Sequence, residues 1–218
     1  MLKLVMGCFT ALSATASFAS SVILEYNVGA PYLTHIAALP GTQVGIPYYD
    51  EDGFRTKPFG ELRTDPPFDL SLTGPNASNK ASNGTAHLSL LRGDSLEVVR
   101  LNGRPFAADS VALAEYSTVF PVPKTIGFQG VFADGSSVST SFTTDGFVLG
   151  GNSLTDFETF AFPANFTGII KLFATTDGFS LDDLMLRTVP EPTSAMHLAI
   201  GVAFNVGLCF RRFHRVAS

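Results

Sequence analysis

The stretch Thr125–Thr144 reads TIGFQGVFADGSSVSTSFTT, and it decides the fold class. Its two halves, Thr125–Ala133 and Ser137–Thr144, both read as β-strands. Between them stands Asp134-Gly135, a hairpin turn pair in which both residues tolerate a positive φ. The stretch therefore predicts two antiparallel strands joined by a tight turn.

The same pattern repeats along the chain on both sides of this stretch. Phe68–Thr73 alternates strictly between apolar and polar residues, and Asn102-Gly103 is a second hairpin pair. Residues 40–67 are broken by proline and glycine and read as loop and short strand. Further strands are predicted at Ser21–Val28, Tyr32–Leu39, Thr85–Leu91, Ser95–Leu101, Ser110–Tyr116, Phe157–Phe162, Gly168–Thr175 and Phe179–Arg187.

Helical periodicity over the length that a stable helix needs is missing between residues 20 and 188. About ten short strands separated by glycine turns indicate two facing antiparallel sheets. The sequence therefore predicts an all-β domain over residues 20–188, a jelly-roll-like β-sandwich.

Composition limits how this domain is stabilised and what it binds. Residues 20–192 contain 10 Lys and Arg against 19 Asp and Glu, a net charge of −9. An acidic surface argues against nucleic acid and anionic lipid as partners, and suits calcium or a surface without polyanions better. Cys8 and Cys209 both lie outside this range, so the domain has no disulfide. Twenty Phe and no Trp predict a Phe-rich core.

The N-terminus reads as a secretory signal peptide over residues 1–19. Lys3 is the basic region, and Leu4–Ala16 is the apolar region. Small residues at positions 17 and 19 predict cleavage by signal peptidase after Ala19. A lipoprotein cleavage site at Cys8 falls too early, because almost no apolar region would precede it.

The C-terminal segment, residues 189–215, has three parts in a fixed order. Two prolines hold Val189, Pro190, Glu191 and Pro192 near polyproline II, an extended and protease-accessible conformation. Residues 193–210 are mostly apolar and about long enough to cross a thin bilayer core as a helix. A basic cluster follows and would stay on the cytoplasmic side: Arg211, Arg212 and Arg215.

This order resembles the bacterial PEP-CTERM sorting signal, a Pro-Glu-Pro motif followed by one membrane helix and an arginine cluster. The resemblance implies processing by an exosortase-type membrane transpeptidase near Pro190-Glu191-Pro192. It further implies a precursor anchored in the inner membrane and delivery to the cell surface or extracellular matrix. His197 and Asn205 interrupt the apolar run. An ordinary tail anchor or a buried C-terminal helix is therefore the alternative.

A second resemblance covers residues 83–187. The segment looks like the β-sandwich domains commonly paired with PEP-CTERM signals, which are similar to galactose-binding-like and carbohydrate-binding jelly rolls. The resemblance implies a fold and leaves function open. It is carried by Asn83-Gly84-Thr85, Leu88, Leu90, Gly103, Phe106, Ser110, Leu113, Glu115, Thr140, Phe142 and Gly178 to Leu186.

Asp182-Asp183 is the candidate metal site, because it interrupts an otherwise apolar strand. Neighbouring strand residues point to opposite faces, so one carboxylate should face inward unless a bulge turns it. A buried carboxylate needs a partner or a metal, and Glu25 on the first strand could complete a structural calcium site. The alternative is a bulge with both carboxylates in solvent. The acidic loop Asp50–Gly53 lacks EF-hand spacing and reads as a solvated turn.

Tyr32, Tyr48 and Tyr49 are candidates for a sugar-stacking platform, with core or loop packing as the alternative. No catalytic residue is predicted. His35 and His87 are the histidines of the domain, and His87 reads as a surface residue. No nucleophile elbow and no His-x-x-x-His pair occurs, so the chain is not expected to be an enzyme.

The function expected from the sequence is that of an exported, non-catalytic surface or matrix protein that contacts exopolysaccharide. One alternative is a lectin-like module with a defined glycan ligand, which a groove with exposed tyrosines would favour. The other is a secreted hydrolase, which convergent carboxylates or a serine near His35 or His87 would favour.

Overall fold

The structure is a computed structural model of the 218-residue chain, and residues 20–189 form one compact unit. The predicted membrane helix, the basic tail and the sorting motif apart from Val189 lie outside the described residues, as do the predicted strand Tyr32–Leu39 and most of the signal peptide. No helix within the described ranges is long and apolar enough to span a bilayer. The described residues are 19–26, 43–46, 48–59, 70–75, 77, 79–90, 95–150, 156–176 and 178–189.

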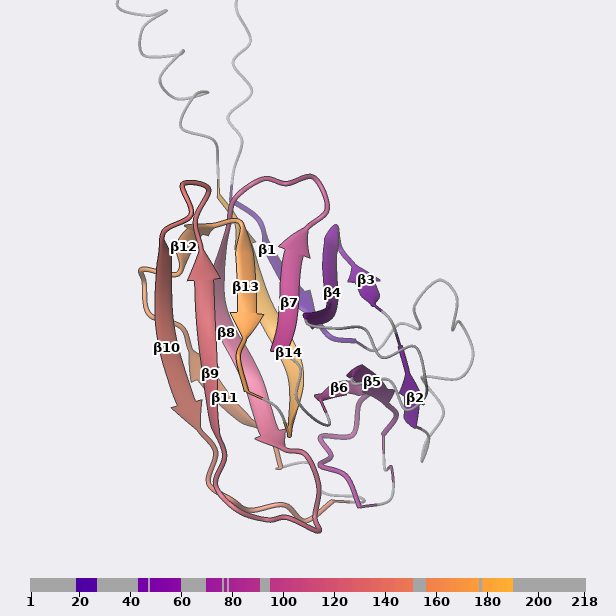
Figure 1. The fold of residues 1–218 in the computed structure, drawn as a ribbon. Coiled ribbons are helices and arrows are strands. Elements are labelled where there is room, and N and C mark those ends of the chain that lie inside the picture. The colour runs from indigo at the N-terminus through magenta and orange to yellow at the C-terminus, as the bar shows by residue number, and fades with distance from the viewer. Residues whose placement is uncertain are drawn as a thin grey trace, which may run out of the picture. The chain divides into compact units, whose positions relative to one another are not determined.

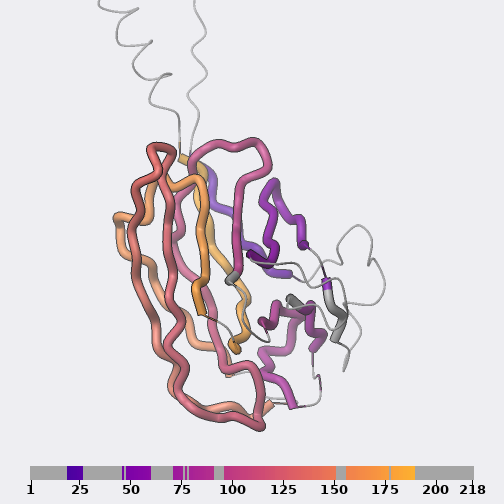
Figure 2. Tube along the Cα trace, viewed as in Figure 1, coloured from indigo at the N-terminus to yellow at the C-terminus, as the bar shows by residue number. Residues whose placement is uncertain are grey.

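The unit is an antiparallel sandwich of two sheets, as Figures 1 and 2 show. The eight-stranded sheet has the order β11-β8-β14-β6-β5-β2, with β1 on β14 and β12 on β8. Its strands are β1 (Ser21–Leu24), β2 (Gln43–Gly45), β5 (Leu70–Thr73), β6 (His87–Leu90), β8 (Phe106–Glu115), β11 (Glu158–Ala161), β12 (Thr167–Ile169) and β14 (Phe179–Thr188).

The second sheet has six strands in the order β10-β9-β13-β7-β4-β3. The chain passes repeatedly between the two sheets, so strands that neighbour in sequence often lie in different layers (Figure 1). The six strands are β3 (Tyr49–Glu51), β4 (Phe54–Phe59), β7 (Ser95–Arg100), β9 (Thr125–Val131), β10 (Ser137–Thr143) and β13 (Lys171–Ala174).

The hairpin that decides the fold class is confirmed. β9 and β10 pair from Thr125 opposite Thr143 to Val131 opposite Ser137. Gly135 has a φ of +84°, and the Asp134 carboxylate accepts hydrogen bonds from the backbone N–H and the hydroxyl of Ser136. The local turn chemistry therefore fixes both the pairing and its register.

The prediction of a hairpin at Asn102-Gly103 is wrong. Gly103 has a φ of +70° and its N–H bonds to the Arg100 carbonyl, so the turn itself is present. However, β7 and β8 on its two sides belong to different sheets. An Asn-Gly turn can connect two paired strands of one sheet, or two strands that lie in different sheets. The sequence of the turn does not distinguish these two connections.

The ends of the unit are tied together by hydrogen bonds. The N–H of Ser20 donates to Thr188 Oγ1, and the N–H of Thr188 donates to the Ser20 carbonyl, both at 2.9 Å. β1 then runs antiparallel to β14 from this point, with Ser21 opposite Arg187. Both ends of the sandwich chain therefore lie at the same place.

The core between the sheets is rich in phenylalanine, as predicted. Phe128 and Phe162 pack edge to face with centroids 5.1 Å apart, and Phe166 is fully buried beside Phe162. Burial of one such ring contributes about 2–3 kcal/mol. Gly130 lies where a Cβ would come within 2.8 Å of Ile169, so the core here is too tight for any side chain at that position.

Candidate functional site

The two outward-facing surfaces of the sandwich differ in what they expose. We call the outer surface of the six-stranded sheet the open face and that of the eight-stranded sheet the covered face. Side chains on the open face are exposed or half-buried, apart from one carboxylate, whereas the central side chains of the covered face are buried. The described residues of the open face are Tyr48, Asp50, Arg55, Lys57, Phe59, Glu97, Val99, Thr125, Gly127, Gln129, Val131, Ser137, Ser139, Ser141, Thr143, Lys171 and Phe173.

One row of side chains crosses the open face from strand to strand. Lys57 of β4 lies opposite Glu97 of β7, and Glu97 lies opposite Phe173 of β13. Phe173 in turn lies opposite Gln129 of β9, which lies opposite Ser139 of β10. Opposed residues of antiparallel strands point to the same side. The row therefore presents an aromatic ring between groups that donate and accept hydrogen bonds.

Glu97 organises the charge at the centre of this row. Its two oxygens lie 2.8 Å from Lys57 Nζ and 3.1 Å from Lys171 Nζ. Burial alone would raise the pKa of Glu97, but the two ammonium groups outweigh it and hold the pKa below its usual value. The carboxylate is therefore ionised at neutral pH and is an acceptor of hydrogen bonds rather than a proton donor.

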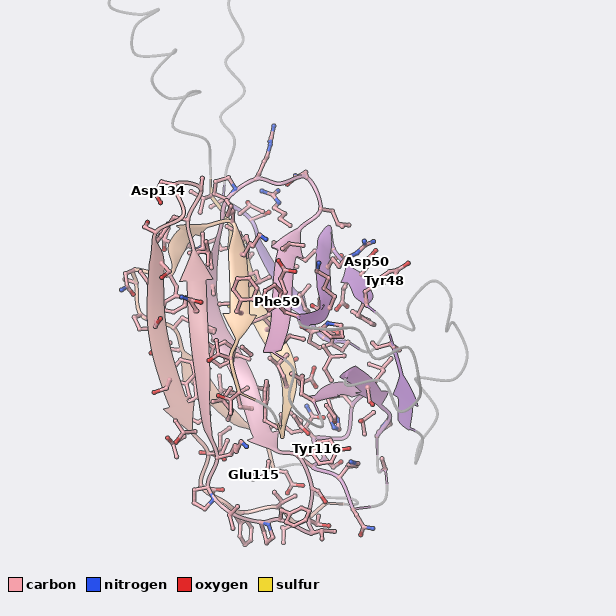
Figure 3. The ribbon with its side chains drawn as sticks, in the orientation of Figure 1. Tyr48, Asp50, Phe59, Glu115, Tyr116 and Asp134 are labelled. Atoms are coloured by element: carbon pink, nitrogen blue, oxygen red, sulfur yellow. The ribbon has the colours of Figure 1, made fainter. Side chains whose placement is uncertain are left out.

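Aromatic rings stand beside these charges. Phe59 is 50% exposed, and its ring centroid lies 4.8 Å from that of Phe173 in a T-shaped contact. At the β3 side, the Arg55 guanidinium lies 4.2 Å over the Tyr48 ring and bonds both oxygens of Asp50 at 2.7 Å. Figure 3 shows Phe59 in front of the sheet, with Tyr48 and Asp50 toward its β3 edge. The open face thus combines apolar ring surface with fixed polar groups.

The structure separates the three tyrosines predicted to stack on sugar. Tyr48 lies at the edge of the open face, and Tyr32 falls outside the described residues. Tyr49 is 1% exposed and packs on Tyr26 with centroids 5.1 Å apart, so its sugar-stacking role is wrong. The period of two in a strand could have shown this, because adjacent residues cannot both face solvent on one side of a sheet.

The covered face is built from small residues. Ala114, Ser180 and Ser89 lie opposite one another on β8, β14 and β6, and all three are fully buried. The hydroxyl of Ser89 bonds that of Thr73 at 2.9 Å and that of Ser180 at 3.4 Å. The hydroxyl groups of this face therefore satisfy one another.

The prediction of His87 as a surface residue is wrong. His87 lies opposite Thr73 on the covered face, is fully buried, and packs its ring against Phe157 with centroids 5.1 Å apart. Neither ring nitrogen has a hydrogen-bond partner among the described residues. Burial lowers the pKa of His87 to about 4. The imidazole is therefore neutral and serves as a packing group.

Asp182 is the buried member of the acidic pair, and it lies on the same side of β14 as Ser180, away from the core residues Phe179 and Leu181. Its Oδ2 accepts hydrogen bonds from Asn83 Nδ2 at 2.7 Å and Thr85 Oγ1 at 2.9 Å, and Oδ1 accepts one from the Asp183 N–H. Burial outweighs these bonds and raises the pKa of Asp182 to about 7. Asp183 is exposed with a φ of +44°, where the pairing of β14 with β8 shifts register.

This arrangement does not fit the calcium site predicted from Glu25, Asp182 and Asp183. Hydrogen-bond donors already occupy both oxygens of Asp182, and a cation would compete with them. Within the described ranges, no three carboxylate, histidine or cysteine side chains come together in a way that could hold a metal ion. The partners that a buried carboxylate requires are an amide, a hydroxyl and a backbone N–H.

Two loops at the end of the sandwich away from Ser20 and Val189 expose apolar side chains. One loop joins β8 to β9 and the other joins β10 to β11. The two loops are in close contact, because a Cβ added at Gly146 of the second would clash with Pro123 of the first. Glu115 anchors the loop after β10, because its Oε1 accepts hydrogen bonds from the Thr144 hydroxyl and the Gly146 N–H. Figure 3 labels Glu115 near this end of the sandwich. We call this surface the loop tip; its exposed apolar residues are Val119, Phe120, Val122, Phe147 and Leu149.

Comparison with known proteins supports the fold class. No protein-family model matches the chain, and no curated protein is similar to it in sequence. A structure of a DUF4465 family protein from Bacteroides caccae superposes with a TM-score of 0.52 at 11% identity, over 79% of this chain and 100% of that one. At this identity the likeness shows a shared β-sandwich fold alone.

Two structures from Clostridium thermocellum match with lower scores. One contains the CBM22-1-GH10 modules of endo-1,4-beta-D-xylanase 10B with xylohexaose: TM-score 0.35, 14% identity, 77% of this chain and 28% of that one. The other is a family 11 carbohydrate-binding module with a beta-1,3-1,4-mixed-linked tetrasaccharide: TM-score 0.31, 10% identity, 66% of this chain and 95% of that one. At these TM-scores they carry no conclusion about this chain.

Proposed function

We propose that this chain is an exported, non-catalytic protein of the cell surface or extracellular matrix that contacts polysaccharide through its open face. The observation that carries the proposal is the row from Lys57 to Ser139, in which the half-buried Phe173 ring lies between the buried Glu97 carboxylate and the half-buried Gln129 amide. A pyranose has an apolar face and a rim of hydroxyls, and this row offers ring surface and polar groups for both.

Charge favours a neutral polysaccharide over a polyanion. Asp50 holds Arg55, and Glu97 holds Lys57 and Lys171, so most of the charge on the face is paired. The net charge of −9 over residues 20–192 repels a polyanion at longer range. The lysine and arginine ends and the partly exposed Asp50 carboxylate still offer hydrogen-bonding groups to sugar hydroxyls. Their ion pairs hold them in place before a ligand arrives.

The delivery part of the proposal rests on the sequence. The signal peptide of residues 1–19 and the Pro190-Glu191-Pro192 motif, with residues 193–210 and the basic tail, support export and processing by an exosortase-type transpeptidase. Alanine at 190–192 is expected to leave the precursor at full length, and mass spectrometry of envelope and secreted fractions measures this. A mature chain that still carries Arg215 would contradict the sorting proposal and leave a plain tail anchor.

Affinity electrophoresis of the purified chain in gels with soluble neutral polysaccharides tests the open face. Phe173→Ala and Phe59→Ala are each expected to weaken retardation about fivefold, because each removes one stacking ring. The matched control is Phe120→Ala, which removes a 70% exposed ring from the loop tip. Equal losses from all three variants, or no retardation of the parent chain, would refute binding through the open face. Retardation by one polysaccharide alone would favour the lectin-like form.

A further inference from the structure

The outermost strand of the six-stranded sheet, β10, has one edge to which no described strand pairs. β10 pairs with β9 alone among the described strands, and Figure 1 shows it at the margin of the sandwich. The bonds from Phe132 N–H to Ser136 O and from Thr144 N–H to Lys124 O show that even-numbered residues of β10 face β9. Antiparallel pairs alternate between bonded and non-bonded. The backbone groups at 137, 139, 141 and 143 therefore point away from the sheet.

Within its own described residues, β10 carries none of the protections that the length and sequence of an edge strand can give. Natural edge strands are shortened, charged, bulged or interrupted by proline. The other terminal strands, β2, β3 and β11, have only three or four residues. β10 has seven, reads SVSTSFT without charge or proline, and keeps an unbroken register with β9. It is therefore a regular template for a further strand.

Apolar side chains beside this edge are incompletely covered. Val138 and Phe142 point toward the core from β10 but are only partly buried. Phe142 stacks on Phe160 of β11 with centroids 5.1 Å apart and an interplanar angle of 20°. Phe160 is also only partly buried. A strand added to β10 would cover this side of the sandwich.

We propose that a second copy of this chain occupies the edge, with β10 of each copy pairing antiparallel to β10 of the other around a two-fold axis at Thr140. This register pairs all seven residues, and it places the outward-pointing backbone groups of each strand opposite those of the partner. Thr140 then faces its own counterpart as a non-hydrogen-bonded pair. The contact is isologous and closes at two copies.

The side chains of β10 favour this occupant because they complement themselves. On the outer face Ser139 meets Ser141, and Ser137 meets Thr143, which are hydroxyl pairs. On the inner face Val138 meets Phe142, an aromatic and β-branched pair. Both kinds of pair stabilise antiparallel sheets. A charge on the strand would repel its symmetry mate, and β10 carries none.

The two-fold symmetry also brings like charges near each other at both ends of the contact. In this register Asp134 of one copy lies near Asp145 of the other. Both carboxylates are exposed and screened by salt, so their repulsion is small. Association is therefore expected to strengthen as salt is added. The paired copies would also join their open faces into one continuous sheet, whatever that face binds.

Disulfide trapping in the full chain tests the register. With Cys8→Ser and Cys209→Ser, the chain has no other cysteine. Cα atoms of a non-hydrogen-bonded pair lie about 4.5 Å apart, within the range of a disulfide. Thr140→Cys is expected to give at least tenfold more covalent dimer under mild oxidation than Thr125→Cys, an exposed position on β9. Equal trapping at the two positions, or a Thr140→Cys adduct with a different protein, would overturn the proposal.

Two further variants distinguish strand pairing from chance collision. Ser141→Pro in the Thr140→Cys chain removes an N–H at the edge away from β9 without removing a bond to that strand, and should reduce trapping at least tenfold. Ser141→Thr keeps that N–H and should trap like the parent. If the proline variant fails to fold, a second variant replaces it. Ser139→Lys with Ser141→Lys places lysines opposite lysines across the contact and should abolish trapping. Undiminished trapping in the folded proline or lysine variant would overturn the proposal.

Discussion

The two outer faces of the sandwich share the same strand geometry and differ in everything that a ligand would meet. On the covered face, Ala114, Ser89 and Ser180 are fully buried, and the hydroxyls of Ser89 and Ser180 bond each other. On the open face, Phe59 is half exposed, and the exposed ends of Lys57 and Lys171 converge on one carboxylate. The alternation of side chains along a strand therefore predicts which side chains face the core. It does not predict whether the outward-facing side chains are exposed or covered by other parts of the chain.

The same contrast appears in the two buried carboxylates of these faces. Asp182 accepts hydrogen bonds from uncharged donors, and burial raises its pKa to about 7. Glu97 is held by two ammonium groups, and its pKa lies below the usual value. One carboxylate therefore weakens the fold when it ionises, and the other stabilises it.

The largest expected effect on stability comes from placing a large side chain on each of the two faces. Ser180→Arg forces a long cation into a fully buried position and should lower the free energy of unfolding by more than about 3 kcal/mol. Thr125→Arg places the same side chain on the exposed part of the open face and should change it by less than about 0.5 kcal/mol. Urea denaturation of both variants measures this. Similar values for the two would mean that the covered face is not closed.

An intermediate effect is expected from Asp182→Asn, and it depends on pH. Because the folded-state pKa is raised, the folded chain retains this proton between about pH 4 and 7, where the unfolded chain has lost it. Wild-type stability from this group is present below about pH 4 and lost as pH rises through 7. The variant should therefore gain stability relative to wild type progressively as pH rises from about 4 to 7, by up to about 4 kcal/mol. Parallel pH profiles would contradict this, and Asp134→Asn, at an exposed carboxylate, should show no such gain.

The smallest effect is expected from Glu97→Gln on the open face. The Lys57 and Lys171 side chains are 43% and 44% exposed, and their ammonium groups can return to water, so the loss at pH 7 should be about 1 kcal/mol. The folded-state pKa is lowered, so the wild-type contribution is present above the unfolded value near 4.5 and lost as pH falls below it. The difference between variant and wild type should therefore shrink in acid. A difference that grows in acid would refute the ion-pair account.

Much of the fold was predictable because strand alternation and turn pairs are local signals. Nine of the predicted strands are observed, among them β9, β10 and β14. Residues 40–67 were read only as loop and short strand because proline and glycine break them, so the individual bounds of β2, β3 and β4 were not predicted. The prediction of one strand over residues 168–175 was wrong, because the chain changes sheet between β12 and β13.

The candidate site was less predictable, because its members come from five strands, of which only β9 and β10 follow each other directly in the sequence. Tyr48 was identified from its residue type, whereas Glu97 and Phe173 gave no signal in the sequence. Glu97 and Phe173 become candidate binding residues only because they lie opposite each other, and the pairing of β7 with β13 brings them together. His87 was misplaced for a related reason: alternation put it on the outer side of its strand, but Phe157 covers that side.

The bonds between Ser20 and Thr188 have a mechanical consequence. Pulling the two ends of the unit apart would open β1 from β14 one hydrogen bond at a time, since both ends leave from the same place. A load between a tether at Val189 and a ligand on the sheets acts differently. It draws β14 lengthwise against β8 and β6, so many ladder bonds bear the force together. The sandwich is therefore weak against separation of its ends and strong against drag on a surface-held molecule.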